Sequence, residues 1–139
     1  MGKINLQKAL IGGLVAGVVL YVIDYLAYGV VFAKDFPLPA GVAGLFGIPI
    51  LDWFFIVDVL YGIALVYLYA AVRPRFGAGP KSAVNAGLLM WVIAGLLHAL
   101  GEAPMGMAPQ KVYTIGTIIS LVQLPLAALA GAKFYTEAA

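Results

Sequence analysis

The chain has 139 residues, of which 64% are hydrophobic and only 10% are charged, and its mean hydropathy is +1.05. A soluble domain carries about 25% charged residues, so this composition excludes an ordinary soluble domain and indicates a protein that folds in lipid. The formal net charge is only +2, and we expect no nucleic-acid partner. The chain contains no cysteine, which excludes disulfides and thiolate metal ligands.

Four apolar runs follow one another along the chain. Each is close to or longer than the roughly 20 residues that a helix needs to cross a bilayer. None alternates between polar and apolar residues as a strand would, and unpaired backbone groups are too costly in lipid for any irregular structure. We therefore predict an all-α, polytopic membrane protein, a single four-transmembrane-helix bundle over residues 1–139. Its helices should span about residues 9–33, 48–72, 82–100 and 112–132.

Small residues lie on one side of the predicted helices. Gly13 and Gly17 form a G-x-x-x-G motif in the first run, Gly62 lies in the second and Gly116 in the fourth. Small residues let helix backbones approach closely in a membrane, so these glycines are predicted helix-packing positions. Two interpretations remain open: the motif packs the helices of one bundle together, or it forms a dimer interface.

Two acids are predicted to lie deep in the membrane at similar heights. Asp24 is about nine residues from the end of the first run and Asp58 about ten residues from the start of the second, which places each ~14 Å deep. An intramembrane acid costs about 2.5–3.5 kcal/mol and normally faces protein or a water-filled cavity. We predict that the two acids meet in an intramembrane polar cluster. Its other members are Gln123, Tyr21 and Tyr28.

Three roles for this cluster remain open. A neutral carboxyl group could hydrogen-bond to a tyrosine or a backbone carbonyl and hold the helices in register. The acids could instead form a path for protons or cations, and two carboxyls close together could share a proton. They could also contact a partner subunit or a cofactor.

The segment between the first two runs, "KDFPLPAGVAGLFG", is unusually apolar for a connection. We expect it to lie in the membrane interface, with its large apolar side chains facing lipid or a partner protein. These side chains are Phe36, Leu38, Leu45 and Phe46.

The middle turn, "RPRFGAGPKS", should join the second and third helices, with Ser82 as the N-cap of the third. The stretch "YAAVRPRFGAGPKSAVNAGLLMW", from Tyr69 to Trp91, resembles the central hairpin of a family of small bacterial four-helix membrane proteins. That family has a central Arg-Pro-Arg-Phe-Gly turn and no assigned function. The resemblance implies the four-helix topology and carries no activity or binding residues with it.

The basic residues predict the orientation. Six lie on the side of the middle turn and the two termini, and only Lys34 and Lys111 lie on the other side. By the positive-inside rule, both termini should be cytoplasmic, in a bacterial inner membrane. The six are Lys3, Lys8, Arg73, Arg75, Lys81 and Lys133.

The stretch "HALGEAPMGMAPQK" after the third run contains the only histidine. His98 and Glu102 are four residues apart and can pair on one helical face, and with Asp52 they form a predicted outer-face cluster. Pro104 should end the helix, and Met105 and Met107 should pack against the segment of residues 34–47. His98 with the two methionines is also a weak candidate for Cu(I), but we predict no metal site and no cofactor.

The short tails and apolar loops favour a non-enzymatic protein. The first hypothesis is an accessory or scaffold subunit of a membrane complex or a homo-oligomer, whose partners are lipid and other membrane subunits or copies of itself. The alternative is a small proton- or cation-coupled carrier that uses Asp24 and Asp58. The third is a copper- or haem-binding membrane protein that uses His98.

Overall fold

The computed structural model describes residues 2–35 and 41–138. Four helical spans, each long and apolar enough to cross a membrane, run over Leu6–Val31, Ile50–Phe76, Pro80–Met105 and Gln110–Ala132. No strand occurs within the described ranges, so the all-helical prediction is confirmed for them. The elements are α1 Leu6–Asp24, η1 Tyr25–Val31, η2 Leu45–Gly47, α2 Ile50–Phe76, α3 Pro80–Met90, η3 Trp91–Leu97, α4 His98–Glu102, η4 Ala103–Met105 and α5 Gln110–Ala132.

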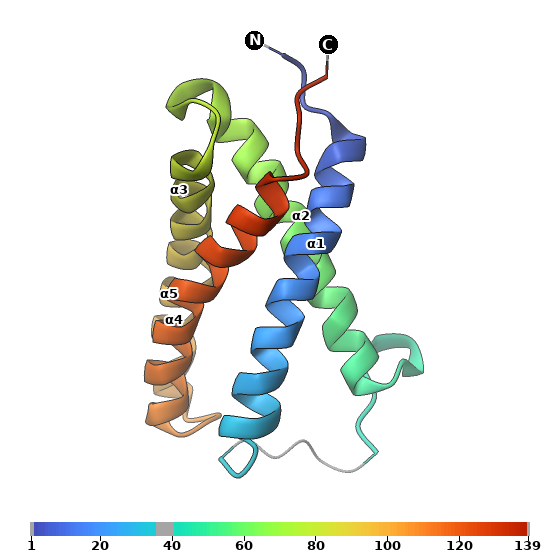
Figure 1. The fold of residues 1–139 in the computed structure, drawn as a ribbon. Coiled ribbons are helices and arrows are strands. Elements are labelled where there is room, and N and C mark those ends of the chain that lie inside the picture. Colours follow the sequence, from blue (N-terminus) through green and yellow to red (C-terminus); the bar gives the residue numbers. More distant parts are fainter. Residues whose placement is uncertain (1, 36–40, 139) are drawn as a thin grey trace.

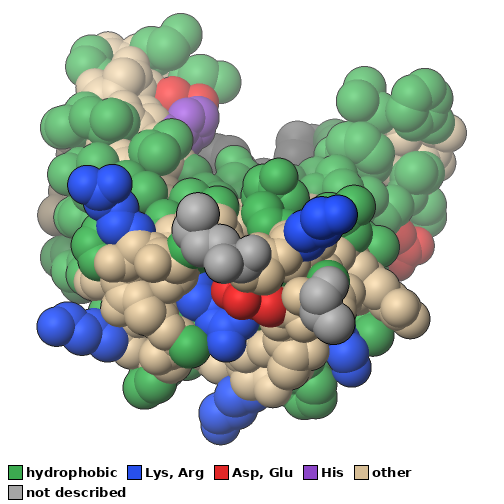
Figure 2. Space-filling view, turned by 90° about the horizontal axis from the view of Figure 1, so that it is seen from above, with side chains coloured by type: hydrophobic (Ala, Val, Ile, Leu, Met, Phe, Trp, Pro, Cys, Tyr) green, Lys and Arg blue, Asp and Glu red, His purple; other side chains and the backbone are tan. Residues whose placement is uncertain are grey.

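Both termini lie at one end of the bundle, next to the turn of residues 77–79 (Figure 1). We call this the terminal end, and the opposite end, with the segments around residues 32–35, 41–49 and 106–109, the loop end. At the terminal end, Lys3 and Ala138 form an antiparallel bridge that ties the two tails together. Lys and Arg side chains surround this end (Figure 2). The predicted placement of both termini on one side is therefore confirmed.

The turn between α2 and α3 differs from the prediction. Helix α2 continues through Arg73 and Pro74 to Phe76, four residues past the predicted end. A proline here removes only one hydrogen bond from the last turn, so the helix survives it. The chain reverses over Gly77 and Gly79, whose positive φ angles of 85° and 120° suit glycine.

Ser82 does not cap α3 as predicted. Gly79 occupies the N-cap position and Pro80 the first turn, where its missing N–H costs nothing. The Ser82 hydroxyl instead donates a hydrogen bond of 2.5 Å to the Gly77 carbonyl and closes the turn from inside.

The predicted glycine positions are contacts within this one chain. A Cβ on Gly13 would lie 2.5 Å from the Ile63 Cα, and one on Gly17 would lie 2.5 Å from the Val59 Cα, so α1 and α2 touch backbone to backbone. On α2, Gly62 faces the same contact. The G-x-x-x-G motif therefore packs α1 on α2, and the dimer-interface interpretation of this stripe is wrong.

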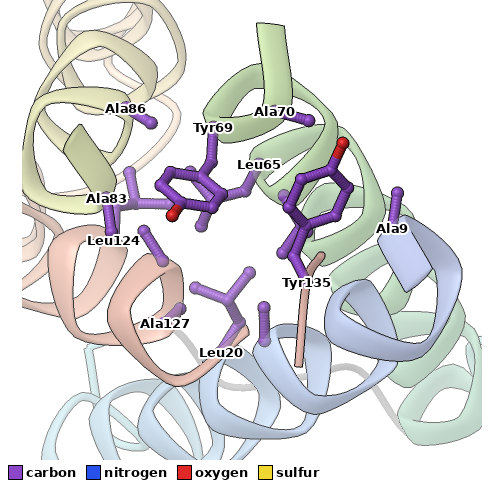
Figure 3. Close-up of a cluster of buried hydrophobic side chains, with 13 residues drawn as sticks. Ala9, Leu20, Leu65, Tyr69, Ala70, Ala83, Ala86, Leu124, Ala127 and Tyr135 are labelled. Atoms are coloured by element: carbon purple, nitrogen blue, oxygen red, sulfur yellow. The ribbon is translucent and has the colours of Figure 1, made fainter. Parts of the chain in front are cut away.

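Two further close contacts attach α5 to its neighbours. Gly131 faces Gly12 of α1, and Pro125 lies directly over Gly87 of α3. The buried core occupies the same part of the bundle, with side chains from all four spans pointing toward one another (Figure 3). It includes Leu20, Leu65, Tyr69, Ala83, Ala86, Leu124 and Ala127.

Toward the loop end the bundle opens. Helix α2 packs on α3 near the terminal end and then diverges from the η3–α4 segment (Figure 1). Seen from the terminal end, the molecule has two arms with a hollow between them (Figure 2). One cavity of the site lies in this opening, lined by residues of α2, η3 and α4 as well as α1 and α5.

Candidate functional site

A polar cluster joins three spans at the point where they diverge. Gln123 of α5 is only 5% exposed, and its Nε2 donates hydrogen bonds to the Asp24 Oδ1 of α1 at 2.8 Å and to the Leu20 carbonyl at 3.1 Å. Asp58 of α2 is 7% exposed and lines the same two cavities as Asp24. The predicted meeting of the two acids and the glutamine inside the bundle is confirmed.

Neither acid of the cluster has a cationic partner in the part of the chain that the structure describes. The ion pairs found among the described residues are Arg73–Glu137, His98–Glu102 and Lys111–Asp35, and all three lie near the ends of the helices. Within the described ranges, the one side-chain donor to Asp24 is the neutral Gln123 amide. The cluster is therefore polar and acidic without a built-in positive charge.

A first cavity, which we call the polar cavity, has a volume of about 440 Å³. Helix α5 and the η3–α4 segment supply most of its lining, α1 and η1 contribute residues that include Asp24, and α2 contributes Asp58 and Tyr61. Asp24, Asp58 and Gln123 lie at one part of its lining, and His98 and Glu102 lie at another, toward the loop end. The polar cavity thus connects the acid pair with the loop end.

A second cavity, the tyrosine cavity, has a volume of about 360 Å³. Its lining residues, among those the structure describes, come from the two spans that contain α1, η1 and α2. It contains both acids, and most of its other lining side chains are aromatic or aliphatic. They include Tyr21, Tyr25, Tyr28, Tyr61, Phe54, Leu51 and Val57.

Four residues line both cavities: Asp24, Asp58, Tyr28 and Tyr61. The acid pair therefore lies at the boundary between the polar cavity and the tyrosine cavity. A group entering from either side reaches the same two carboxyls.

The predicted tyrosines have different surroundings. Tyr28 reaches across to α5, where a Cβ on Gly116 would lie 2.7 Å from its hydroxyl oxygen, so Gly116 makes room for this side chain. Tyr21 packs edge-on against Phe55, with ring centroids 5.3 Å apart, and lines only the tyrosine cavity. Tyr28 thus lies beside the acids in both cavities, whereas Tyr21 lies in the tyrosine cavity alone and packs on Phe55.

Some residues of the polar cavity escaped the sequence analysis. The Trp91 indole donates a hydrogen bond of 2.9 Å to the Thr117 carbonyl, and Ser120 donates one of the same length to the same carbonyl. Gly95 leaves space beside Trp91 and Ser120. The four-residue spacing from Gly116 to Ser120 on one face of α5 is the available signal, but from the sequence only Gly116 is assigned, as a helix-packing position.

The predicted outer-face cluster is only partly formed. His98 Nε2 lies 3.2 Å from Glu102 Oε1, so the predicted pair is confirmed, and the α-helix ends at Glu102, just before Pro104. Asp52, by contrast, is exposed in the first turn of α2 and lines neither cavity. It starts the helix that diverges from α4, which is why the three residues do not form one cluster.

The methionines do not become covered as predicted. Met105 is 68% exposed and Met107 is 67% exposed, although Met107 lines the polar cavity. Leu45 and Phe46 are exposed as predicted, at 64% and 94%. Phe36 and Leu38 lie outside the described residues.

Potential metal ligands are few in the part of the chain that the structure describes. There, no three His, Asp or Glu side chains are grouped in a way that could hold a metal ion. The resemblance of residues 69–91 to a family of small membrane proteins stays a prediction. No protein-family model, curated protein or solved structure matches this chain.

Proposed function

We propose that this chain is a small, non-enzymatic membrane carrier that binds a proton or another cation at the Asp24–Asp58 pair. The observation that carries the proposal is the position of the pair: two acids on neighbouring spans face two cavities and have no cationic partner among the described residues. Two carboxyls that line the same cavities can share one proton or bind one positive ligand between them.

The energetic cost of the acids supports a functional role. Acids inside a membrane are expensive, and where they occur they usually mark an ion or proton path. A purely structural Asp24 would need only its hydrogen bond to Gln123, which already links α1 to α5. That role leaves unexplained the second acid, the cavities on both sides, and the polar lining that continues to His98 and Glu102.

The proposed orientation places the terminal end in the cytoplasm of a bacterial inner membrane. It rests on the six basic residues at that end and the two at the loop end. The polar cavity then opens toward the outside. Single cysteines at Ala78 and Ala108 test the orientation: in intact cells, an impermeant maleimide should label only position 108, and labelling of position 78 alone would reverse it.

The carrier proposal can be tested with proteoliposomes that contain a pH-sensitive dye. A proton gradient imposed across the membrane should decay faster with the wild-type protein than with empty liposomes. Asp24→Asn and Asp58→Asn should each abolish the difference, because each removes one acid of the pair. Asp52→Asn is the matched control and should behave as the wild type, since Asp52 lines neither cavity. Equal decay in all four proteins would reject the carrier.

A second candidate function, an accessory or scaffold subunit, is favoured by the loop end. Leu45 and Phe46 are largely exposed in the short η2 turn, with Phe46 held at φ 61°, an unusual conformation for a bulky residue. A partner subunit or a second copy could cover them. Cross-linking from position 46 in native membranes tests this: a discrete cross-linked protein supports the subunit, and cross-links to lipid alone oppose it.

The structure adds no support to copper or haem binding through His98. Its imidazole already pairs with Glu102, and the two methionines are exposed. The carrier and the accessory subunit are therefore the two functions proposed for this chain.

A further inference from the structure

The tyrosine cavity suggests which cation the acid pair receives. We propose that it binds a lipophilic organic ammonium ion, with the positive nitrogen at Asp24 and Asp58 and the apolar substituents against the tyrosine rings. This inference rests on the proposed cation site and names its ligand class. It is carried by the joint presence of two acids, four tyrosines and one phenylalanine around one cavity.

The aromatic lining has a specific electrostatic consequence. The face of an aromatic ring carries a negative quadrupole and attracts a cation within about 6 Å of its centre, most strongly where water is excluded. Tyr21, Tyr25 and Phe54 present rings on the cavity that the polar cavity does not share. Rings and carboxylates together match an ammonium ion that carries both charge and hydrocarbon.

Other cations match this cavity less well. A proton needs a carboxyl group and a path, but it needs no space, whereas the cavity of about 360 Å³ falls within the size range of small-molecule sites. A bare metal cation prefers a shell of oxygen ligands. Here Leu51, Val57 and Phe54 supply hydrocarbon where such a shell would need oxygen.

The walls of the cavity also indicate the route of entry. Of the described elements, only α1, η1 and α2 line it, and Tyr25 and Tyr61 remain 49% and 43% exposed. In a membrane these exposed edges face the lipid. A ligand dissolved in the bilayer interface could therefore enter sideways between the two spans and reach the acids without crossing the polar cavity.

The test uses the full chain in detergent and isothermal titration with benzyltrimethylammonium, a permanently charged ion that cannot donate a proton. Saturable binding is expected above an empty-micelle blank. Tetramethylammonium and Na⁺, which lack the apolar ring, should bind at least tenfold more weakly. Asp24→Asn and Asp58→Asn should each weaken binding of benzyltrimethylammonium at least tenfold.

Tyr25 separates the aromatic contribution from the acidic one, because it lines only the tyrosine cavity. Tyr25→Leu keeps an apolar side chain and removes the ring face, and should weaken binding about fivefold. Tyr25→Phe keeps the ring and should remain within about twofold of the wild type. Tyr67→Leu, on an exposed part of α2 that lines neither cavity, should change nothing.

The outcomes distinguish the inference from the proposed function. If benzyltrimethylammonium does not bind, or if Tyr25→Leu binds it as the wild type does, the ammonium site is wrong. If acid-dependent proton flux in proteoliposomes is still observed in that case, the carrier proposal stands, and its cation is not an organic ammonium ion. If both the binding and the flux are absent, both proposals fall.

Discussion

The span formed by α1 and η1 packs on α2 differently in its two halves. Near the terminal end, Gly13 and Gly17 bring the backbone of α1 onto α2. Near the loop end, Tyr21, Tyr25 and Tyr28 continue along the span, and here a cavity separates it from α2. Small residues permit backbone contact in membranes, and large rings prevent it. The change from glycine to tyrosine along one helix therefore sets where the bundle closes and where it opens.

The span Pro80–Met105, which also runs from the terminal end to the loop end, repeats this contrast. Helix α3 is regular where it packs on α5 at Gly87, and the chain then continues as the π-helical segment η3 along the polar cavity. Segment η1, next to the tyrosine cavity, is also π-helical. Wide π turns occur mostly at functional sites. The terminal half thus forms a packed base, and the loop half carries the irregular walls of the site.

The largest expected effect comes from a bulky side chain placed at the α1–α2 contact in the packed base. Gly17→Leu should destabilise the protein by about 3 kcal/mol or prevent folding, because its Cβ would lie 2.5 Å from the Val59 Cα and the two helices would have to separate. Gly101→Leu in α4 is the matched control, since nothing lies within 4 Å of its Cβ position. Thermal unfolding followed by circular dichroism in detergent measures both. Equal midpoints would show that the base is not tightly packed.

A smaller effect is expected at the junction of the two halves. Gln123→Leu removes the donor to Asp24 and to the Leu20 carbonyl, and should destabilise the protein by about 1–3 kcal/mol because both acceptors lose their partner. Gln110→Leu is the control: its side chain also donates to a backbone carbonyl, that of Ala103, but at an exposed position. Chemical unfolding in mixed micelles compares them. If the Gln110 variant loses as much stability, the junction has no special role.

The contacts of Arg73 with the C-terminal tail should contribute about 1 kcal/mol to the free energy of unfolding. The Arg73 Nη1 lies 3.3 Å from Glu137 Oε1 as an ion pair without hydrogen-bond geometry, and the guanidinium lies 5.8 Å from the centre of the Tyr135 ring. Arg73→Ala should remove both interactions and increase amide hydrogen exchange in the C-terminal tail. Arg75 lies two residues further along the same helix and is exposed, so Arg75→Ala serves as the control. An unchanged exchange rate at Tyr135 would show that the tail is held by Asn5 and Lys3 alone.

Periodicity and length were enough to predict the base of the fold. The four spans and the placement of Asp24 near Asp58 follow from hydropathy, helical rise and the cost of an acid in lipid. The small residues predict close helix packing, but the sequence leaves open whether it occurs within one bundle or between two copies. The helix ends were less predictable. The sequence "RPRF" has the composition of a turn, but α2 continues through it, because its proline interrupts only the last turn of the helix.

The arrangement of the loop half could not be predicted from local patterns. Asp52 was grouped with His98 and Glu102 because all three lie at one depth, but depth along a helix does not define the angle at which helices diverge. The same divergence leaves Met107 exposed and places Thr117 and Gly95 in a cavity. These features depend on the size of side chains on neighbouring helices and on two π-helical segments, neither of which hydrophobic periodicity reports.

The smallest expected effect lies at the loop end. The side chains of His98 and Glu102 are 63% and 41% exposed, so water and salt screen their contact of 3.2 Å. A pair four residues apart on an exposed helix contributes only about 0.2–0.5 kcal/mol, and His98→Ala should reduce stability by no more than that. A double-mutant cycle with Glu102→Ala, at low and high salt, isolates the coupling between the two side chains, which should disappear in high salt. A coupling above about 1 kcal/mol that survives salt would contradict the comparison, because one exposed pair within α4 would then stabilise the loop half as strongly as a buried contact stabilises the base.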